Sequence, residues 1–206
     1  MNLRKVAGLA ASMLFVWAGA SIGTRAFANE PSLTPARACS SLLHLRIPGS
    51  DMVITHVDTV PTAPAGTVRS GPGPQTIPVA LPAYCRVKGI IDSHRGPDGK
   101  SYGLTFALAL PQAWNGRFLF QGGGGLNGVL RPPLGIGATG DRPALARGFA
   151  VVSTDGGHRG AVFDSSFLVD QQASLDFAFN AVPTVTAVAK RLVAIYYGRP
   201  AARSYF

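Results

Sequence analysis

A run of four glycines is the part of this sequence with the clearest chemical potential. It stands in the segment Gln121-Gly122-Gly123-Gly124-Gly125-Leu126-Asn127-Gly128, directly after the apolar stretch Arg117–Phe120, which is typical of a buried strand. Glycines at such a point allow a sharp turn and let backbone N–H groups face a cavity. N–H groups placed in this way can stabilise developing negative charge, as an oxyanion hole does.

Two other interpretations of the glycine run stay open. The spacing Gly123-x-Gly125-x-x-Gly128 matches a dinucleotide fingerprint, and Asp155 ends the next long apolar strand, where a ribose-binding acid would stand. That fingerprint must open a helix, however, and Arg131-Pro132-Pro133 follows instead. The third interpretation is a turn whose glycines have no chemical role.

A second candidate is the segment Ser153-Thr154-Asp155-Gly156-Gly157-His158. It places an acid and a histidine just past the C-terminal end of a strand, where sites on parallel sheets gather. A Ser-His-Asp relay is possible in principle. Because Asp155 and His158 are three residues apart in a glycine turn, we instead expect a local hydrogen bond that shapes the loop. Triads are defined by geometry and not by proximity in the chain.

Apolar alternation predicts a β-hairpin before the glycine run. One strand is expected at Arg86–Ile91, and the segment His94–Gly99 has the chemistry of a turn. The second strand follows from apolar residues that recur at period two, namely Tyr102, Leu104, Phe106, Leu108 and Leu110. A further strand is expected at Met52–Val60.

After the hairpin, the pattern changes to strands that alternate with a helix. Strands are expected at Arg117–Phe120 and Phe149–Thr154. A helix follows whose apolar residues recur at helical spacing, and Gly198 and Pro200 end it. This order predicts an α/β protein with a mixed sheet and an N-terminal hairpin.

The helix leaves two points open. Pro183 fits its first turn, or marks a kink if the helix begins nearer Ser174. A crossover helix should also feed a parallel strand, and Ser204-Tyr205-Phe206 begins one where the sequence stops. We therefore expect residues 29–206 to be a truncated part of a longer domain. The alternative is a small complete domain.

Residues 1–28 have the pattern of a signal peptide. Arg4 and Lys5 form a short basic head, an apolar run follows from Val6 to Gly23, and Ala26-Phe27-Ala28 has the small-x-small pattern of a cleavage site. An uncleaved membrane anchor is the alternative, but the run is short for a hydrocarbon core of about 30 Å. We expect a periplasmic or secreted protein with no membrane attachment after cleavage.

The composition favours one globular domain. Hydrophobic residues make up 47% and charged residues 14%, which suffices for a core and argues against a disordered chain. The formal net charge is +9, but the arginines are scattered and no basic run is interleaved with aromatic residues. Nucleic acid is therefore not an expected partner.

The two cysteines are Cys39 and Cys85. In an oxidising compartment such a pair is a disulfide by default, and the alternative is two unpaired buried thiols. Neither cysteine lies near a second cysteine or a histidine at ligand spacing, so no metal site is expected. No cofactor is expected either.

Several short motifs together resemble the tannase and feruloyl esterase family. Each motif alone is modest, but they follow one another in the family's order from about Cys85 onward. They are Trp114-Asn115-Gly116-Arg117-Phe118, the Gln121–Gly128 loop, Ala146-Arg147-Gly148-Phe149-Ala150, the segment 153–158, Asp176-Phe177-Ala178-Phe179, Tyr196-Tyr197-Gly198-Arg199 and Arg203-Ser204-Tyr205-Phe206.

The resemblance implies an α/β-hydrolase fold with a large lid and a serine nucleophile in a Cys-Ser-x-Gly-Gly elbow. That elbow would come immediately after the strand that begins at Ser204, so the catalytic Ser, Asp and His are expected beyond Phe206. The calcium site of the lid is expected there too.

Within this sequence, the resemblance assigns a functional or structural role to only a few residues. Gly125 matches the residue that gives an oxyanion N–H, with Gly124, Asp155 and His158 in loops near the site. Cys39 and Cys85 match an amino-terminal disulfide.

The activity implied for the whole protein is hydrolysis of esters of aromatic carboxylic acids, such as gallate, ferulate or a terephthalate monoester. A small aromatic ester is then the expected partner, and the mechanism is acyl transfer to serine and then to water. The 206-residue chain alone is expected to be inactive, because its nucleophile and base are missing. The alternatives are a small secreted binding module without catalysis and a dinucleotide-binding domain.

Overall fold

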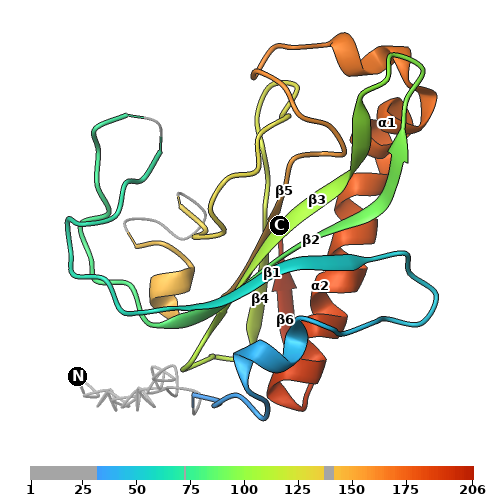
Figure 1. Cartoon of the computed structure of the whole chain (residues 1–206). Coiled ribbons are helices and arrows are strands. Elements are labelled where there is room, and N and C mark those ends of the chain that lie inside the picture. Colours follow the sequence, from blue (N-terminus) through green and yellow to red (C-terminus); the bar gives the residue numbers. More distant parts are fainter. Residues whose placement is uncertain (1–31, 72, 137–141) are drawn as a thin grey trace, which may run out of the picture.

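A six-stranded mixed sheet forms the centre of the fold, in the strand order β1-β2-β3-β5-β4-β6 (Figure 1). The computed structural model describes residues 32–71, 73–136 and 142–206. The predicted signal peptide, residues 1–28, lies outside these ranges. The strands are β1 Val53–Val60, β2 Tyr84–Arg95, β3 Ser101–Pro111, β4 Arg117–Gln121, β5 Ala150–Thr154 and β6 Arg203–Tyr205.

The sheet combines an antiparallel and a parallel part. β1, β2, β3 and β5 pair antiparallel in that order, whereas β4 runs parallel to both β5 and β6. The predicted mixed sheet and its β2–β3 hairpin are therefore confirmed. β2 extends beyond the predicted end at Ile91, because an irregularity between Ile91 and His94 carries the strand on through polar residues to Arg95.

One long helical run covers a face of the sheet. It consists of α1 Gln171–Leu175, a π-helical turn at Asp176–Asn180 and α2 Ala181–Tyr197. Pro183 accounts for the π-helical turn, because proline lacks an N–H and crowds the carbonyl group four residues before it. The helical run thus begins ahead of Ser174, and its irregular stretch lies just before the proline.

The apolar stripe of α2 packs on the sheet. Gly198 ends the helix in the left-handed conformation, with φ 72°, as its position predicts. The run Gln171–Tyr197 is also long and apolar enough to cross a membrane by length and composition, but packing on the sheet accounts for its buried stripe. The α2 residues that the sequence periodicity singled out are all buried: Val185, Val188, Ala189, Leu192, Val193 and Tyr196.

The Cys39–Cys85 disulfide ties the segment before β1 to β2. Its Cα atoms lie 5.6 Å apart, within the range that a disulfide requires. The predicted bridge is therefore confirmed. It encloses β1 and the Pro- and Gly-rich stretch 61–82, which Figure 1 shows as a long excursion from the sheet. Short 3₁₀ turns lie at Cys39–Leu42, Leu145–Arg147 and Ser166–Val169.

Candidate functional site

The two loops that the sequence singled out lie at one edge of the sheet. β4 and β5 are parallel neighbours, with Gln121 paired to Ser153, so the loops that follow them leave from the same edge. The Gly128 N–H donates a hydrogen bond of 3.0 Å to the Asp155 carbonyl oxygen and joins the loops directly. The shared edge expected for the glycine run and the Asp155–His158 segment is thus present.

The backbone of the glycine loop explains why its residues are glycines. Gly125 has φ +62°, and an added Cβ atom would lie 2.7 Å from the Val162 carbonyl oxygen. Gly128 has φ +70°, and its Cβ would lie 2.9 Å from the Gly160 carbonyl oxygen. L-residues rarely adopt such φ values, so both positions require glycine. At Gly124, in contrast, a Cβ would enter open space.

The loop does not have the geometry of a dinucleotide fingerprint. No helix opens within residues 122–136, which the structure describes in full. Asp155, the candidate for a ribose-binding acid, is engaged in its own loop. The fingerprint's phosphate site depends on a helix N-terminus directly after the glycines. The dinucleotide interpretation of this loop is therefore wrong.

The first half of the glycine loop holds unused hydrogen-bond donors. Within the described part of the chain, no hydrogen bond uses the N–H groups of residues 122–125. The next three N–H groups, from Leu126 to Gly128, all bond to backbone carbonyl oxygens. Consecutive free donors at the C-terminal end of a buried strand are what a site for a developing oxyanion requires.

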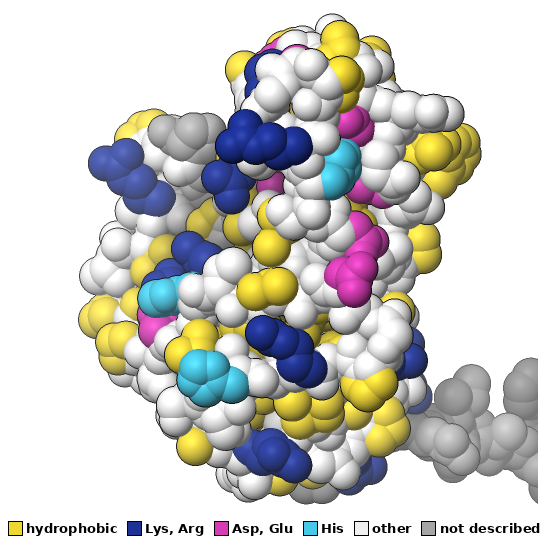
Figure 2. All heavy atoms as spheres, turned by 45° about the vertical axis from the view of Figure 1, so that its right-hand side comes forward, with side chains coloured by type: hydrophobic (Ala, Val, Ile, Leu, Met, Phe, Trp, Pro, Cys, Tyr) yellow, Lys and Arg dark blue, Asp and Glu magenta, His cyan; other side chains and the backbone are white. Residues whose placement is uncertain are grey.

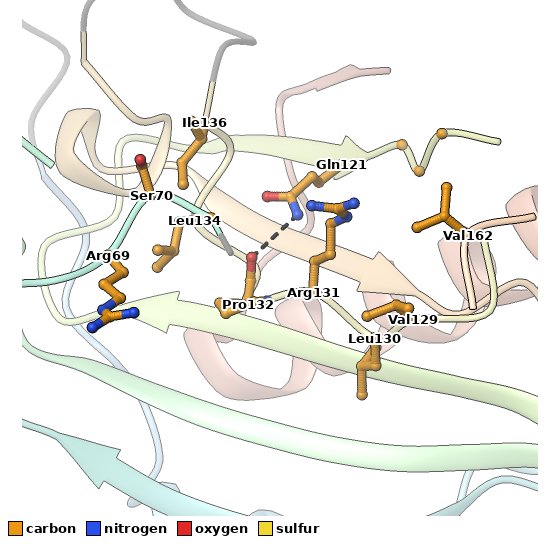
Figure 3. A pocket seen from close by; sticks show the side chains of 14 residues that line it. Arg69, Ser70, Gln121, Val129, Leu130, Arg131, Pro132, Leu134, Ile136 and Val162 are labelled. Atoms are coloured by element: carbon orange, nitrogen blue, oxygen red, sulfur yellow. Dashed lines mark hydrogen bonds between the residues drawn. The ribbon is translucent and has the colours of Figure 1, made fainter. Parts of the chain in front are cut away.

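A pocket with a volume of about 650 Å³ adjoins this loop (Figure 3). Gly122, Gly123 and Gly124 form part of its wall, while a Cβ atom added to Gly125 would meet Val162. The remaining wall is mostly apolar, with two arginines. The side chains that contribute to it are Arg69, Ser70, Gln121, Val129, Leu130, Arg131, Pro132, Leu134, Ile136 and Val162.

Asp155 shapes the turn after β5. Its side chain is only 1% exposed, and its Oδ1 atom accepts hydrogen bonds from the N–H groups of Thr105 and Gly157, both at 3.1 Å. Burial raises the pKa of Asp155 to about 6, although these N–H groups and the charge of Arg159 oppose the shift. Asp155 thus makes a local hydrogen bond that shapes the turn, as predicted, but its partner in the turn is the Gly157 N–H and not His158.

His158 is packed among aromatic rings. Its ring is 2% exposed, stacks on Phe167 at a centroid distance of 3.6 Å, and meets Phe177 edge-on at 5.7 Å. In the described part of the chain, neither ring nitrogen has a hydrogen-bond partner. Burial lowers the pKa of His158, so the ring is kept neutral. We conclude that His158 supports the loop by packing.

Sequence reasoning missed one polar pair near this edge. The Nε2 atom of His94 lies 3.1 Å from Oδ1 of Asp170, and the same oxygen accepts a 2.7 Å hydrogen bond from the Ala173 N–H at the start of α1. The pair joins the tip of the β2–β3 hairpin to the helix. The two residues are 76 positions apart, and nothing local in the sequence marks them as partners.

The grouping of metal-binding side chains and the distribution of charge bear on which ligands the protein could bind. Among the described residues, no three His, Cys, Asp or Glu side chains gather as metal ligands would. On the face drawn in Figure 2, Lys and Arg side chains are dispersed among acidic and apolar ones.

The raised pKa of Asp155 predicts a specific pH dependence of stability. The folded state holds this proton up to about pH 6, whereas the unfolded chain releases it near pH 4, so ionisation destabilises the fold as pH rises between these values. We expect the free energy of unfolding of the unmutated protein (the parent), relative to that of Asp155→Asn, to fall by about 2–3 kcal/mol from pH 4 to pH 7. Asparagine keeps the acceptor oxygen for Thr105 and Gly157. Urea unfolding across this range measures the difference.

Asp58→Asn is the matched control. The Arg86 side chain donates hydrogen bonds to Asp58 and lowers its pKa. The stability that this carboxylate contributes is present at neutral pH and is lost below about pH 5. The two variants should therefore behave differently above pH 5. If the free energies of unfolding of Asp155→Asn and of the parent changed with pH in the same way, this would contradict the burial of a titrating carboxyl group at this position.

A family model described as tannase and feruloyl esterase matches residues 85–206, which include β2 to β6, the glycine loop and the Asp155 turn. The chain belongs to the tannase and feruloyl esterase family. The match begins at Cys85, where the ordered motifs of the sequence also begin.

Relatives of this chain are named as a terephthalate monoester hydrolase or as esterases. It is 44% identical over 135 residues to mono(2-hydroxyethyl) terephthalate hydrolase of Piscinibacter sakaiensis, covering 62% of this chain and 22% of that protein. It is 34% identical over 172 residues to an uncharacterized esterase of Xanthomonas campestris pv. campestris, covering 82% of this chain and 27% of that protein. A probable feruloyl esterase B-2 of Aspergillus flavus is 36% identical over 104 residues, covering 50% and 18%.

The fold agrees with this assignment. Feruloyl esterase B from Aspergillus oryzae superposes with a TM-score of 0.57 and 26% identity, covering 81% of this chain and 30% of that one. The mixed sheet with its covering helix is thus of the α/β-hydrolase type. The chain spans roughly a quarter of the length of the first two relatives that it matches, 22% and 27%.

Proposed function

We propose that this chain is the N-terminal part of a secreted serine esterase that hydrolyses esters of aromatic carboxylic acids. The observation that carries the proposal is the set of free N–H groups in residues 122–125, at the end of β4 and beside a largely apolar pocket. Membership of the tannase and feruloyl esterase family supports it. So do the names of its relatives, which include feruloyl esterases and a terephthalate monoester hydrolase.

The proposed reaction is a two-step acyl transfer. A serine beyond Phe206 attacks the carbonyl carbon of the ester, and the carbonyl oxygen takes the negative charge of the tetrahedral intermediate. A histidine removes the serine proton and passes it to the departing alcohol, and an acid orients that histidine. Water then attacks the acyl-enzyme by the same route in reverse and releases the carboxylic acid.

The strand order supports a position for the serine nucleophile next to the glycine loop. β6 runs parallel to β4, with Phe118 paired to Ser204. A nucleophile on a sharp turn after this strand would lie at the edge where the glycine loop ends β4. Gly125 is the proposed first oxyanion donor, and the residue after the nucleophile would be the second. Gly124, Asp155 and His158 shape the surrounding loops.

The test compares the whole gene product with the 206-residue chain. An in-frame Cys-Ser-x-Gly-Gly after the codon for Phe206 is expected. The whole gene product should hydrolyse p-nitrophenyl and aromatic esters and be inhibited by a serine-directed phosphonate, whereas the 206-residue chain should not exceed the buffer rate. Turnover by the shorter chain that the phosphonate abolishes would contradict the proposal. So would a gene with no such continuation, which would favour a binding module.

Secretion is tested by the mature N-terminus. On expression in a bacterial host, we expect processing after Ala28, so that the exported protein begins at Asn29. N-terminal sequencing of periplasmic material measures this. An intact Met1 in the membrane fraction would instead indicate an anchor.

A further inference from the structure

The side chain of Asn127 ties the glycine loop to the end of the neighbouring strand. Its Nδ2 atom donates a 2.9 Å hydrogen bond to the carbonyl oxygen of Thr154, the last residue of β5. Its backbone N–H donates to the Gly124 carbonyl oxygen at 3.2 Å and closes a turn within the loop. Asn127 therefore connects the residues that have free N–H groups to the sheet.

The amide group of Asn127 also packs directly against the glycine loop. A Cβ atom added to Gly123 would lie 2.5 Å from Oδ1 of Asn127 and 2.6 Å from its Cγ atom. A Cβ atom at Gly156, in the Asp155 turn, would lie 3.4 Å from Nδ2. The amide group thus contacts both loops, and it approaches Gly123 this closely because that residue has no side chain.

The position of Asn127 suits its residue type and rests on a fixed partner. Its φ is 52°, a left-handed value that asparagine adopts more readily than most L-residues. Thr154, which accepts its hydrogen bond, is held in turn by β3, because the Thr154 hydroxyl donates to the Thr105 carbonyl oxygen at 2.8 Å. The amide group therefore has a defined place relative to the sheet.

The glycine loop needs a restraint from outside its own backbone. Consecutive glycines have the least restricted backbone of any residues. In the described part of the chain, the N–H groups of residues 122–125 make no hydrogen bonds that would fix their direction. Donors lower a barrier most when they already point to the place where charge develops. The contact with Gly123 and the hydrogen bond to Thr154 supply such a restraint.

We propose that Asn127 is a positioning residue, which holds the N–H groups of residues 122–125 in the direction that an oxyanion requires. This inference rests on the proposed esterase function and deepens the account of the same site. Gly122, Gly123 and Gly124 line the large pocket, whereas Asn127 is not among its lining residues. Its side chain therefore acts on the reaction through the loop and not through contact with the ester.

The test replaces Asn127 by glycine in the whole gene product. Asn127→Gly removes the amide group and still permits the φ of 52°. We expect kcat for p-nitrophenyl esters to fall on the order of 10- to 100-fold, since misplaced groups lose much of their effect on a reaction. KM should change far less, because the pocket wall that contacts the ester in the ground state is intact.

Asn115→Gly is the matched control. Like Asn127, Asn115 precedes a glycine of positive φ and bonds to backbone through its amide group. It donates to the Arg147 carbonyl oxygen at 2.7 Å and accepts from the Arg117 N–H at 3.0 Å. It stands before β4, at the end of the strand opposite the glycine loop. This variant should lower the unfolding midpoint, as Asn127→Gly does, but leave kcat unchanged.

Hydrogen–deuterium exchange of the whole gene product tests the position of the loop without catalysis. The N–H groups of Leu126 and Gly128 bond to the carbonyl oxygens of Val162 and Asp155, and these bonds persist only while the loop keeps its shape. After correction for intrinsic rates, both N–H groups should exchange faster in Asn127→Gly than in the parent. In Asn115→Gly their exchange should be unchanged.

The two measurements separate this inference from the proposed function. A whole gene product without esterase activity contradicts the proposed function, and faster exchange in Asn127→Gly then still supports the positioning role. Unchanged exchange in that variant overturns the inference, with or without hydrolysis. A folded Asn127→Gly protein with the parent's kcat also overturns it. So does an equal loss of kcat in Asn115→Gly, or a rise in KM that accounts for the whole loss of kcat/KM.

Discussion

Removal of the Cys39–Cys85 disulfide is expected to lower the free energy of unfolding by about 4 kcal/mol. The bridge joins residues 46 positions apart, and in the chain-entropy model a closed loop of this length restricts the unfolded state by about that amount. The segment that the bridge holds needs such a restraint, because the described residues of the Pro- and Gly-rich stretch 61–82 form no helix and no strand of the sheet. The double variant Cys39→Ala/Cys85→Ala should unfold at a clearly lower urea concentration than the oxidised parent.

Trp114 is a suitable probe for this measurement. It is fully buried and its ring stacks on Tyr197 at a centroid distance of 4.3 Å, so its fluorescence reports the packing of α2 on the sheet. A reducing agent should destabilise the parent to a similar extent and leave the double variant unchanged. Equal unfolding midpoints for the oxidised parent and the double variant would show that the bridge contributes no stability.

Local patterns predicted the parts of the fold that local physical chemistry determines. The period-two residues of β3 are buried because the strand is central in the sheet, and Gly198 ends α2 because it tolerates a positive φ. The disulfide followed from cysteine count and compartment. The parallel direction of β6 followed from the crossover helix, and the structure adds that its neighbour is β4.

Contacts between distant segments could not be predicted in this way. The His94–Asp170 pair depends on where the hairpin tip meets the start of α1. The π-helical turn Asp176–Asn180 depends on a helix that continues upstream of Pro183, and the sequence left that continuation undecided. The place of the Arg131–Pro132 segment beside the glycine loop depends on hydrogen bonds from the side chains of Gln121 and Ser153, which no local pattern in the sequence indicates. Single residues of this kind acquire a role only through the tertiary structure.

The glycine loop was predictable from the sequence in part, and the rest of its description depends on the tertiary structure. The glycine run and its place after a strand were visible in the sequence, and the resemblance singled out Gly125. The structure adds that the Gly124–Gly125 segment has free N–H groups and that Gly125 has a positive φ. It also changes the design of the test, because Gly125→Ala would press a methyl group against the Val162 carbonyl oxygen and is no mild substitution.

Gly125→Pro in the whole gene product is expected to lower kcat by about 100- to 1000-fold. The substitution removes the N–H that we propose to bind the tetrahedral oxyanion, and losing one such donor raises the barrier by about 2.7–4 kcal/mol. Because the donor acts mainly in the transition state, KM should change far less than kcat. Binding of a boronic acid that mimics the tetrahedral intermediate should weaken in parallel, which a ground-state ligand would not show.

Gly124→Ala is the matched control for this prediction. Its Cβ would enter open space and its N–H is retained, so the loop keeps its shape and its donors. Proline at residue 125 also conflicts with the φ of +62°, so circular dichroism and the unfolding midpoint must first show that the Gly125→Pro protein is folded. If that folded protein retained the parent's kcat, Gly125 would have no part in the reaction. A loss of kcat in Gly124→Ala as large as in Gly125→Pro would point to crowding of the pocket, since the alanine variant keeps every N–H group of the loop.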